Sequence, residues 1–456
     1  MRKTVVINVV GLSRSVVNKY TPFLSKYIES GTSAVIKPAF PAVTCTAQSN
    51  YLTGKSPSDH GIVANGWYYK DDCEIKFWKQ SNKLVQADKI WDQAKKMDSD
   101  FTVANMFWWF NMYSSADISV TPRPQYPADG RKIPDIYTQP AGLRDKLQKA
   151  LGTFPLFDFW GPKTSVKSSR WIADSSIYVD RLYDPTLTFI YLPHLDYCLQ
   201  KHGENSPETY KDLIEIDNVV RDLVNHYEER NARVIILSEY GISPVNKSVS
   251  LNRELRKAGF LAIREENGLE LLDAGASKAF AVADHQVAHI YVNDPTVADQ
   301  VKSLLQTVSG VEEVLDKEGK VKFKIDHIRA GDFVAIAEED AWFDYYYWLE
   351  EQKAPDFART VDIHRKPGYD PVEMFVNPKI KFPLLYIGSR LIKKKLGFRT
   401  LLDVIPLDPG LVKGSHGRIP DNKNYWPLFI SKEKMSLNSE EVDSTDIYSL
   451  IMQHLQ

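Results

Sequence analysis

The sequence predicts an α/β fold: a three-layer sandwich with a central, mostly parallel sheet. Short runs that are apolar at every position alternate along the 456 residues with longer segments that are apolar on one side only. Strands buried on both faces of a parallel sheet have the first pattern, and the helices that cover such a sheet have the second. Strand and helix in turn build βαβ units, which place helices on both faces.

The expected elements follow from these patterns in chain order. The first strand is expected from Thr4 to Val10, a dense β-branched run that ends at Gly11. A helix over residues 14 to 30 should follow, because apolar side chains recur at helical spacing and Gly31 offers a stop. Further strands are expected near 35 to 36, 101 to 107, 187 to 193 and 233 to 238, and further helices near 88 to 97, 141 to 150 and 207 to 229.

The composition bounds the compartment and the partners. The 57 basic and 59 acidic side chains give a net charge of −2, which offers no global field for a nucleic acid polymer, so none is expected as a partner. Only three cysteines occur, too few for a disulfide framework, and they suggest a reducing compartment. The first apolar run is short for a secretion signal, and no stretch of about 18 apolar residues follows. We therefore expect a cytoplasmic protein.

One segment favours a peripheral lipid contact. The lysines at positions 393 to 395 follow the apolar run FPLLYIGSRLI. This pattern suits a membrane surface or an acidic lipid head group. A charged and solvated helix end explains the same residues, and the sequence leaves both interpretations open.

Polar side chains stand directly after the expected strands. Asp196 follows LTFIYLP, Glu239 and Tyr240 follow RVIILS, and Thr44 follows the short strand around residues 35 and 36. In open α/β sheets the chemistry collects in loops beyond the carboxyl ends of the strands. The sequence thus predicts that these residues gather at one edge of the sheet.

The segment FPAVTCTAQSNYLTGKSPSDHGIVANGWY, residues 40 to 68, resembles the nucleophile region of the nucleotide pyrophosphatase/phosphodiesterases of the alkaline phosphatase superfamily. Thr44, a Thr-Gly pair, a His-Gly-Ile run and Asn65 stand at the family's spacing. A hydroxyl at a helix start meets unpaired backbone N–H groups, which suit a phosphate oxyanion. Thr44 is the candidate nucleophile, and the alternative is a Thr that only caps the helix. By the resemblance, Asn65 would donate its amide to a phosphoryl oxygen.

The resemblance continues to the end of the chain, through YLPHLDYCLQKHG, LSEYGI and GSHGR. It implies an alkaline-phosphatase-like fold and one elaborated α/β domain over residues 1 to 456. Within that domain, residues from about 253 to 340 should form a smaller α+β lobe. The aromatic-rich stretch from 342 to 398 should form an irregular insertion.

Members of this family hold two zinc ions with three aspartates and three histidines, and this sequence departs from that set. The matching positions are Val10, Asp196, Gln200, Glu239, Tyr240 and His416. Asp196 and His416 are unchanged, whereas Val10 cannot bind a cation. The replaced positions supply oxygen donors, which suit manganese, magnesium or iron better than zinc. The resemblance implies a divalent metal, zinc, with these other ions as alternatives.

Compensating residues are expected in two other segments. In ADHQVAHIYV, His285 is the preferred replacement ligand, because it follows Asp284 and precedes a clear β run. A hydrogen-bonded structural histidine is the alternative. In DIHRKPGYDP, Arg365 and Lys366 could hold a substrate phosphate. A solvated loop explains that pair almost as well.

These residues together predict a metal-dependent hydrolase of phosphodiester or pyrophosphate bonds that uses a threonine nucleophile on a small phosphorylated substrate. The candidate metal ligands are Asp196, Glu239, Tyr240, His285 and His416. One alternative is a catalytically degenerate member that binds a phosphorylated or lipid-linked ligand. Another is a phosphomonoesterase or phosphonate hydrolase. The sequence does not determine the substrate, the leaving group or the oligomeric state.

Overall fold

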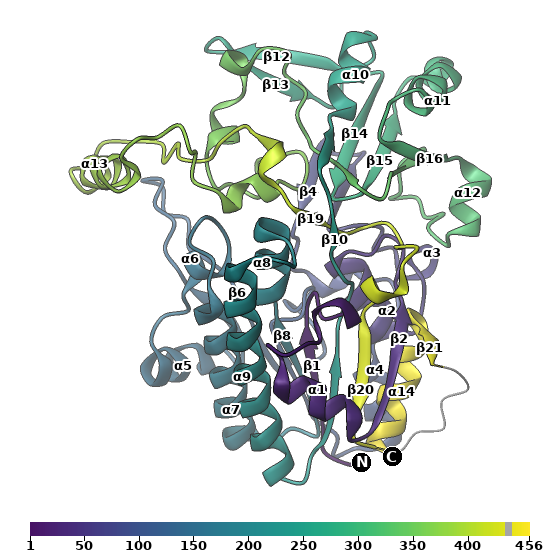
Figure 1. The fold of residues 1–456 in the computed structure, drawn as a ribbon, viewed down its shortest axis with the longest axis vertical. Helices are drawn as coiled ribbons and strands as arrows, with labels where there is room; N and C mark the ends of the chain where they lie inside the picture. Colours follow the sequence, from purple (N-terminus) through teal and green to yellow (C-terminus); the bar gives the residue numbers. More distant parts are fainter. Residues whose placement is uncertain (434–439) are drawn as a thin grey trace.

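A nine-stranded sheet forms the centre of the molecule in the computed structural model, which describes residues 1–433 and 440–456 (Figure 1). The strand order is β21-β2-β20-β9-β1-β8-β5-β6-β7. The strands are β1 Thr4–Val9, β2 Thr32–Lys37, β5 Val103–Met106, β6 Ile118–Pro122, β7 Ile136–Gln139, β8 Leu187–Leu192, β9 Arg233–Leu237, β20 Leu428–Ser431 and β21 Glu441–Asp443.

The middle of this sheet is parallel, as the sequence predicts. Strand β1 pairs in parallel with β8 and with β9, so that Thr4 lies opposite Leu187 on one side and Arg233 on the other. Strands β5 and β6 continue the parallel arrangement, and β7 and β20 run antiparallel to their neighbours. All six residues of β1 are buried, because helices cover the sheet on both faces.

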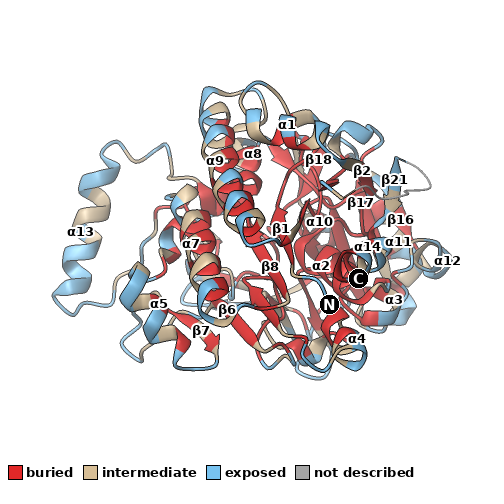
Figure 2. Cartoon of the chain, turned by 90° about the horizontal axis from the view of Figure 1, so that it is seen from below, coloured by how far each residue is buried: buried red, intermediate tan, exposed pale blue. Residues whose placement is uncertain are grey.

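Helices form the two outer layers of the sandwich (Figure 2). One face carries α1 Pro22–Glu29, α7 Val166–Tyr183, α8 His194–His202 and α9 Pro207–Glu229. The other carries α2 Thr44–Thr53, α4 Ile90–Met97 and α14 Ile447–Leu455. The predicted three-layer fold with a mostly parallel central sheet is confirmed. Both chain ends lie at the same end of the molecule, away from the carboxyl end of β1 (Figure 1).

The predicted helix over residues 14 to 30 is wrong in its first half. Arg14–Val16 forms a single 3-10 turn, and α1 begins only at Pro22. Proline lacks the backbone N–H that a helix interior needs, but the first position of a helix tolerates it. The apolar spacing therefore continues upstream of Pro22 without a continuous helix.

A second sheet packs beyond the carboxyl end of the central one (Figure 1). It is antiparallel, in the order β14-β15-β17-β16. Its strands are β14 Ala279–Asp284, β15 Val287–Val292, β16 Val311–Leu315 and β17 Phe333–Ala337. The hairpin β12 Ala262–Glu266 and β13 Leu269–Asp273 and the helices α10 Leu251–Lys257, α11 Ala298–Gln306 and α12 Lys317–Lys322 belong to the same region. The division into one domain with a smaller lobe stays a prediction.

Further elements lie outside the two large sheets. They are β3 Gly66–Tyr69, β4 Glu74–Phe77, β10 Ser243–Pro244, β11 Lys247–Val249, β18 Ala341–Phe343, β19 Gly414–Ser415, α3 Pro57–His60, α5 Leu143–Leu151 and α6 Leu156–Phe159. The stretch from 342 to 398 contains several 3-10 turns and then one regular helix, α13 Pro383–Lys395, which projects from the body (Figure 1). No helix in the described ranges is long and apolar enough to span a bilayer.

Candidate active site

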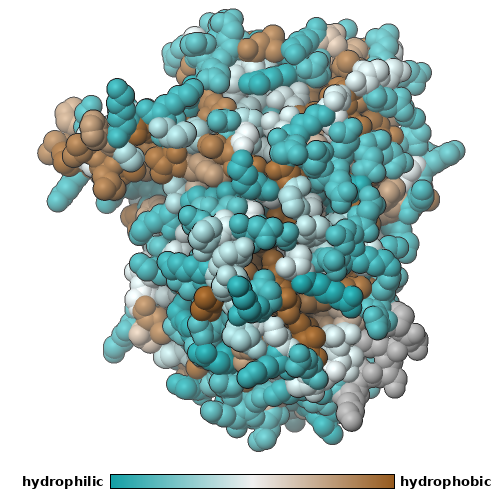
Figure 3. Space-filling view, viewed as in Figure 1, coloured by the Kyte–Doolittle hydropathy of each residue, from teal (hydrophilic) through white to brown (hydrophobic). Residues whose placement is uncertain are grey.

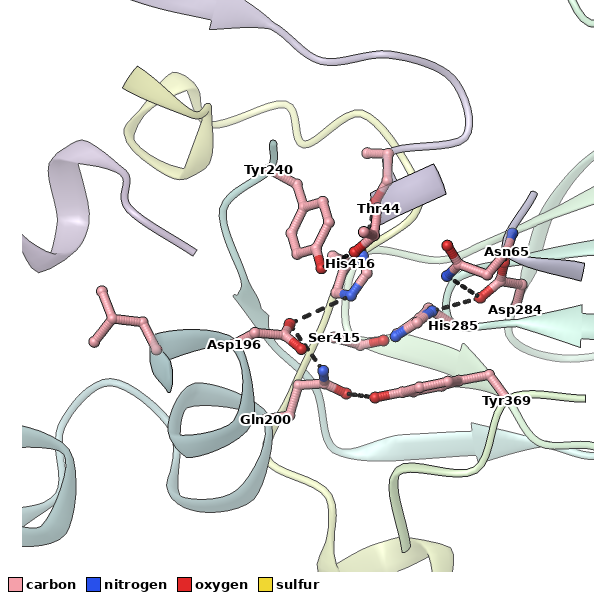
Figure 4. Close-up of polar contacts among 12 residues, drawn as sticks. Thr44, Asn65, Asp196, Gln200, Tyr240, Asp284, His285, Tyr369, Ser415 and His416 are labelled. Atoms are coloured by element: carbon pink, nitrogen blue, oxygen red, sulfur yellow. Dashed lines mark hydrogen bonds and ion pairs between the residues drawn. The ribbon is translucent and has the colours of Figure 1, made fainter. Parts of the chain in front are cut away.

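Segments that are far apart in the chain meet beyond the carboxyl ends of the central strands. Thr44 opens α2 after β2, Asp196 lies in the first turn of α8 after β8, and Tyr240 follows β9. The β14–β15 hairpin contributes His285, and the segment after β19 contributes His416. Figure 4 shows these side chains pointing toward one another. The predicted gathering at one edge of the sheet is therefore observed.

Thr44 is the first residue of a helix that is buried along its whole length. Val43 before it is extended, and Gly54 ends the helix at a φ of 65°, which a residue without Cβ adopts easily. The Thr44 side chain does not lie in apolar packing, because its hydroxyl lies 2.9 Å from the hydroxyl of Tyr240. A hydroxyl oxygen and the positive end of a helix dipole thus share one polar site.

Asn65 is held beside the start of α2. Its Oδ1 accepts the backbone N–H of Cys45 at 3.0 Å, and its Nδ2 donates to Asp284 at 3.1 Å. The backbone N–H of Asn65 donates to the second oxygen of Asp284 at 2.8 Å. Because an amide NH₂ carries two hydrogens, Asn65 keeps one donor for a further acceptor.

Asp196 and His416 face each other across the site. His416 donates from Nδ1 to the carbonyl of Ala42 at 2.7 Å, so its Nε2 carries the lone pair. That Nε2 lies 3.6 Å from Oδ1 of Asp196 and has no hydrogen-bond partner among the described residues. Burial lowers the pKa of His416 well below its usual value, which keeps the ring neutral.

His285 sits at the turn of the β14–β15 hairpin with a φ of 62°. Its Nδ1 lies 2.7 Å from the Asp284 carboxylate, and its ring centroid lies 3.7 Å from that of His416. Burial lowers the pKa of His285 well below its ordinary range. A neutral imidazole that donates from Nδ1 exposes a lone pair on Nε2, which is the form that binds metals.

Gln200 supports Asp196. Its Nε2 donates to Oδ1 of Asp196 at 3.0 Å, and its Oε1 accepts the hydroxyl of Tyr369 at 3.1 Å. The ring of Tyr369 in turn stacks on His285 with a centroid separation of 3.6 Å. Gln200 thus orients a carboxylate of the site, and Tyr369 joins the two sides (Figure 4).

Glu239 lies in a different environment. Both Asn8 on β1 and Gln48 on α2 donate to its Oε1, each at 2.5 Å, and its Oε2 has no hydrogen-bond partner among the described residues. Burial raises the pKa of Glu239 to about 8, although the hydrogen bonds from Gln48 and Asn8 and an interaction with the Thr44 hydroxyl act in the opposite direction. One oxygen of this carboxylate is therefore committed to internal amides.

The pKa values of the other acidic groups of the site are also raised. Burial raises the pKa of Asp196 to about 7 against hydrogen bonds from Gln200 and Tyr240. Burial likewise raises the pKa of Asp284 to about 6, which the Asn65 hydrogen bonds oppose. Tyr240 stacks on His416 at a centroid separation of 3.6 Å, and burial raises its phenol pKa well above the usual value. Tyr240 is hence a neutral donor.

The donor set fits one divalent cation better than two. Asp196 and His416 present an oxygen and an unshared nitrogen 3.6 Å apart, a separation that bonds of about 2 Å to one ion can bridge, and His285 lies beside them. The remaining family positions offer a buried Val10, the half-committed Glu239 and the phenol of Tyr240. The assignment of all five predicted ligands stays a prediction.

A second group of donors lies on the helices α8 and α9. Among the described residues, ligand atoms of His194, Asp212 and Glu215 lie within 4.8 Å of one another. His194 Nε2 lies 3.3 Å from Asp212 and 3.9 Å from Glu215, so contacts between a histidine and two carboxylates explain the group without a metal. Thr44 is not part of this group.

The predicted substrate-binding pair lies elsewhere. Lys366 is buried and its Nζ contacts the carboxylates of Asp370 and Glu373, each at 2.7 Å. Arg365 is exposed and lies 3.5 Å from Asp356. The charge of Lys366 is thus already balanced inside the protein, and a role for either residue in phosphate binding stays a prediction.

Sequence reasoning did not single out Asn8, Gln48 or Tyr369. All three side chains are buried and hydrogen-bonded to residues of the site. Two of them could have been found as polar side chains among buried neighbours. Asn8 interrupts the apolar run of β1, and Gln48 lies in a helix without an exposed residue. A buried amide needs partners, and here the partner is Glu239.

Comparison with known proteins identifies the chain's relatives. A family model described as type I phosphodiesterase / nucleotide pyrophosphatase matches residues 4–370. The chain belongs to this family. Members of the type I phosphodiesterase / nucleotide pyrophosphatase family are typically dependent on a divalent metal, and neither the family nor its relatives identify which metal serves here.

Two curated relatives show how far the sequence has diverged. Ectonucleotide pyrophosphatase/phosphodiesterase 2 of Saccharomyces cerevisiae is 26% identical over 267 residues, which are 53% of this chain and 48% of that protein. Ectonucleotide pyrophosphatase/phosphodiesterase family member 7 of Rattus norvegicus is 24% identical over 285 residues, 59% of this chain and 56% of that protein. The chain spans about half the length of the curated relatives it matches.

Solved structures share the fold over the whole chain. Phosphonoacetate hydrolase from Sinorhizobium meliloti 1021, in complex with phosphonoformate, has a TM-score of 0.62 at 13% identity and covers 100% of this chain and 96% of its own. An inactive variant of murine ectonucleotide pyrophosphatase/phosphodiesterase 5, in complex with AMP, has a TM-score of 0.61 at 15% identity, with 100% and 95% covered. The expected alkaline-phosphatase-like fold is confirmed.

Proposed function

We propose that this family member hydrolyses phosphodiester or pyrophosphate bonds and that Thr44 is its nucleophile. The observation that carries the proposal is the position of the Thr44 hydroxyl. It stands at the first residue of a buried helix, 2.9 Å from the hydroxyl of Tyr240, in a cluster that also contains Asp196 and His416. A Thr that only capped its helix would not need this polar surrounding.

Glu239 is the proton acceptor in this account. Its carboxylate interacts with Thr44, and its pKa of about 8 makes it a stronger base than an ordinary glutamate. Glu239 takes the proton of Thr44 as the Oγ–P bond forms and the bond from phosphorus to the leaving oxygen breaks. The leaving group departs as an oxyanion. Water then attacks phosphorus as the bond from phosphorus to the Thr44 oxygen breaks; Glu239 returns its proton to that oxygen, and the attacking water releases one proton to solvent.

Two features stabilise the charge on the phosphoryl oxygens. The N-terminus of α2 presents its positive end, and Asn65 keeps one amide hydrogen for a further acceptor. Asn65 is already oriented by Asp284 and by the N–H of Cys45, so no reorganisation is needed when charge develops. A cation held by Asp196 and His416 would supply further positive charge at the same position.

Replacing Thr44 tests the proposal. We expect purified protein to hydrolyse bis-p-nitrophenyl phosphate when supplied with manganese, magnesium, zinc or iron in turn. Thr44→Ala should lose at least about a thousandfold in rate, since the covalent step disappears, and Thr44→Ser should keep a measurable fraction. Thermal unfolding of both variants controls for folding. Full activity in Thr44→Ala would remove Thr44 from the reaction.

A binding protein without turnover is the second candidate. Its support is the commitment of Glu239 to Asn8 and Gln48 and the loss of ligand chemistry at Val10 and Tyr240. This candidate predicts that neither wild type nor Thr44→Ala turns over any substrate with any of the four ions. Calorimetric titration with AMP then measures whether a phosphorylated ligand binds at all.

Phosphonate and phosphomonoester hydrolysis belong to the same substrate panel. The fold is shared with a phosphonoacetate hydrolase, so phosphonoacetate and p-nitrophenyl phosphate are the two probes to add. The relative rates on the three probes decide the reaction. The two p-nitrophenyl esters release the same leaving group from a diester and a monoester, whereas phosphonoacetate requires cleavage of a P–C bond.

A further inference from the structure

Helix α13 and the chain on either side of it form a protrusion, residues 379–402, which we name the α13 arm. It extends away from the rest of the molecule (Figures 1 and 2). The arm contains seven basic residues and neither Asp nor Glu. The basic residues are Lys379, Lys381, Arg390, Lys393, Lys394, Lys395 and Arg399. The protein as a whole carries a charge of −2, so this segment is a local concentration of positive charge.

The outer side of the arm is apolar and exposed. Leu384 is 84% exposed, Leu385 74% and Leu396 70%. Ile392 and Phe398 are also more than half exposed. Figure 3 shows hydrophobic surface gathered on this protrusion. Single exposed leucines are common, but a contiguous group of this kind marks an interaction site.

The inner side of the arm is fastened to the body. Tyr386 donates its hydroxyl to Asp403 at 2.9 Å, and Arg390 lies 3.0 Å from the same carboxylate. Tyr386 and Ile387 pack against a small buried cluster that includes Val404. The helix therefore has a defined inner face, and the exposed leucines lie on the side that the body does not cover.

We propose that the α13 arm binds the surface of an anionic lipid bilayer. Leu385, Ile392 and Leu396 lie at helical spacing on one side and would enter the interface between head groups and acyl chains. Lys393, Lys394 and Lys395 follow at the end of the helix, where long side chains reach acidic head groups while their stems stay at the apolar boundary. The binding does not depend on the reaction proposed for Thr44.

The charge pattern favours a bilayer over a second copy of the chain. A protein partner would need an acidic and apolar groove, whereas an anionic bilayer offers both components over an unlimited area. The arm is also a projecting helix rather than a flat face, so it can enter an interface without contact from the rest of the surface (Figure 2).

Sedimentation with lipid vesicles tests the arm in the full chain. We expect the protein to partition onto vesicles of phosphatidylcholine mixed with phosphatidylserine, and to do so weakly with phosphatidylcholine alone. Each lysine near an anionic surface contributes roughly a fivefold gain in partitioning, so the triple change Lys393→Gln, Lys394→Gln, Lys395→Gln should lose about a hundredfold. The double change Leu385→Ser, Ile392→Ser should lose binding to both vesicle types.

Matched substitutions away from the arm serve as controls. Lys146→Gln, Lys149→Gln, Lys167→Gln removes three exposed lysines, and Ile328→Ser removes an exposed apolar side chain. These should leave partitioning unchanged, and all variants should keep the thermal unfolding of wild type.

Three results would overturn the proposal. They are equal partitioning onto neutral and anionic vesicles, equal loss from the control lysines, or no partitioning combined with a dimer in solution that Leu385→Ser, Ile392→Ser dissociates. The last result would assign the arm to a second copy of the chain.

Discussion

The two halves of the family's metal position differ in how their donor atoms are used. In the half formed by Asp196, His416 and His285, each imidazole donates from Nδ1 to a carbonyl or carboxylate and keeps Nε2 unprotonated. In the half formed by Glu239 and Tyr240, one carboxylate oxygen accepts two internal amides and a phenol replaces an imidazole. The first half, which we call the open half, presents two ring nitrogens that carry lone pairs. In the second, which we call the closed half, internal amides occupy Oε1 of Glu239, while Oε2 has no hydrogen-bond partner among the described residues.

In our proposal this difference reflects the loss of one half of a two-ion site and the retention of the other. Val10 offers no ligand atom, and Asn8 and Gln48 occupy only Oε1 of the Glu239 carboxylate. The hydroxyl of Tyr240 then lies next to Thr44. The proposed nucleophile thus lies beside a phenol that stacks on the ring of His416.

Removing the open half should have the largest effect. We expect His416→Ala to lose its bound cation and about a thousandfold in rate on bis-p-nitrophenyl phosphate, since a metal at the reacting phosphate is worth several kcal/mol. Metal content and turnover are measured together. His202→Ala, at the partly exposed end of α8, is the matched control. A His416→Ala protein with wild-type metal content would contradict the assignment of ligands.

Changing the closed half should have a smaller and pH-dependent effect. In the proposed reaction Glu239 acts as its carboxylate, so the wild-type rate should rise with pH up to the pKa of about 8 and then level. Glu239→Gln should lower the rate about a hundredfold and abolish its rise with pH.

The same residue should affect stability. Because the pKa of Glu239 in the folded protein lies above the usual 4.5, the wild type should lose folding stability as pH rises from 4.5 to about 8, whereas Glu239→Gln should not. Glu338→Gln, an exposed change, should keep both profiles.

His289 contrasts with the two histidines of the open half, because both of its ring nitrogens are hydrogen-bonded. His289 donates to the carbonyl of Val63 and accepts the N–H of Gly331, and burial lowers its pKa to about 4. Its folded pKa lies below the unfolded value of 6.5, so its contribution is present above 6.5 and is lost as pH falls toward 4. We expect roughly 2 to 3 kcal/mol less stability at about pH 4.5 than at about pH 7.

Chemical unfolding at the two pH values measures this effect. His289→Gln should be less stable at neutral pH but should change less on acidification. His327→Gln, a partly exposed histidine, should keep the wild-type difference. Equal acid sensitivity in His289→Gln and wild type would place the titrating group elsewhere.

The sequence was sufficient for the parts that depend on local pattern. Apolar runs predicted the strands of the central sheet, and the segment around Thr44 predicted a helix that begins there. It was not sufficient for contacts between distant segments. The bonds from Asn8 and Gln48 to Glu239 join positions 231 and 191 residues apart, and no local pattern encodes them.

Two other differences have local physical causes. Pro22 delays α1, which the apolar spacing alone does not reveal. Lys366 reads as a free loop charge in the sequence, but the turn at Asp370 brings two carboxylates to its Nζ. A charge that is paired through tertiary structure looks the same in sequence as one that is free.

An anomalous-scattering map of crystals grown with manganese or zinc tests the central claim most directly. The account predicts one strong peak between Oδ1 of Asp196 and Nε2 of His416, on the side of the site that faces His285. Two peaks of equal height, with the second beside Glu239 and Tyr240, would contradict the closed half. Peaks confined to His194, Asp212 and Glu215 would contradict the assignment of the cation to the site of Thr44.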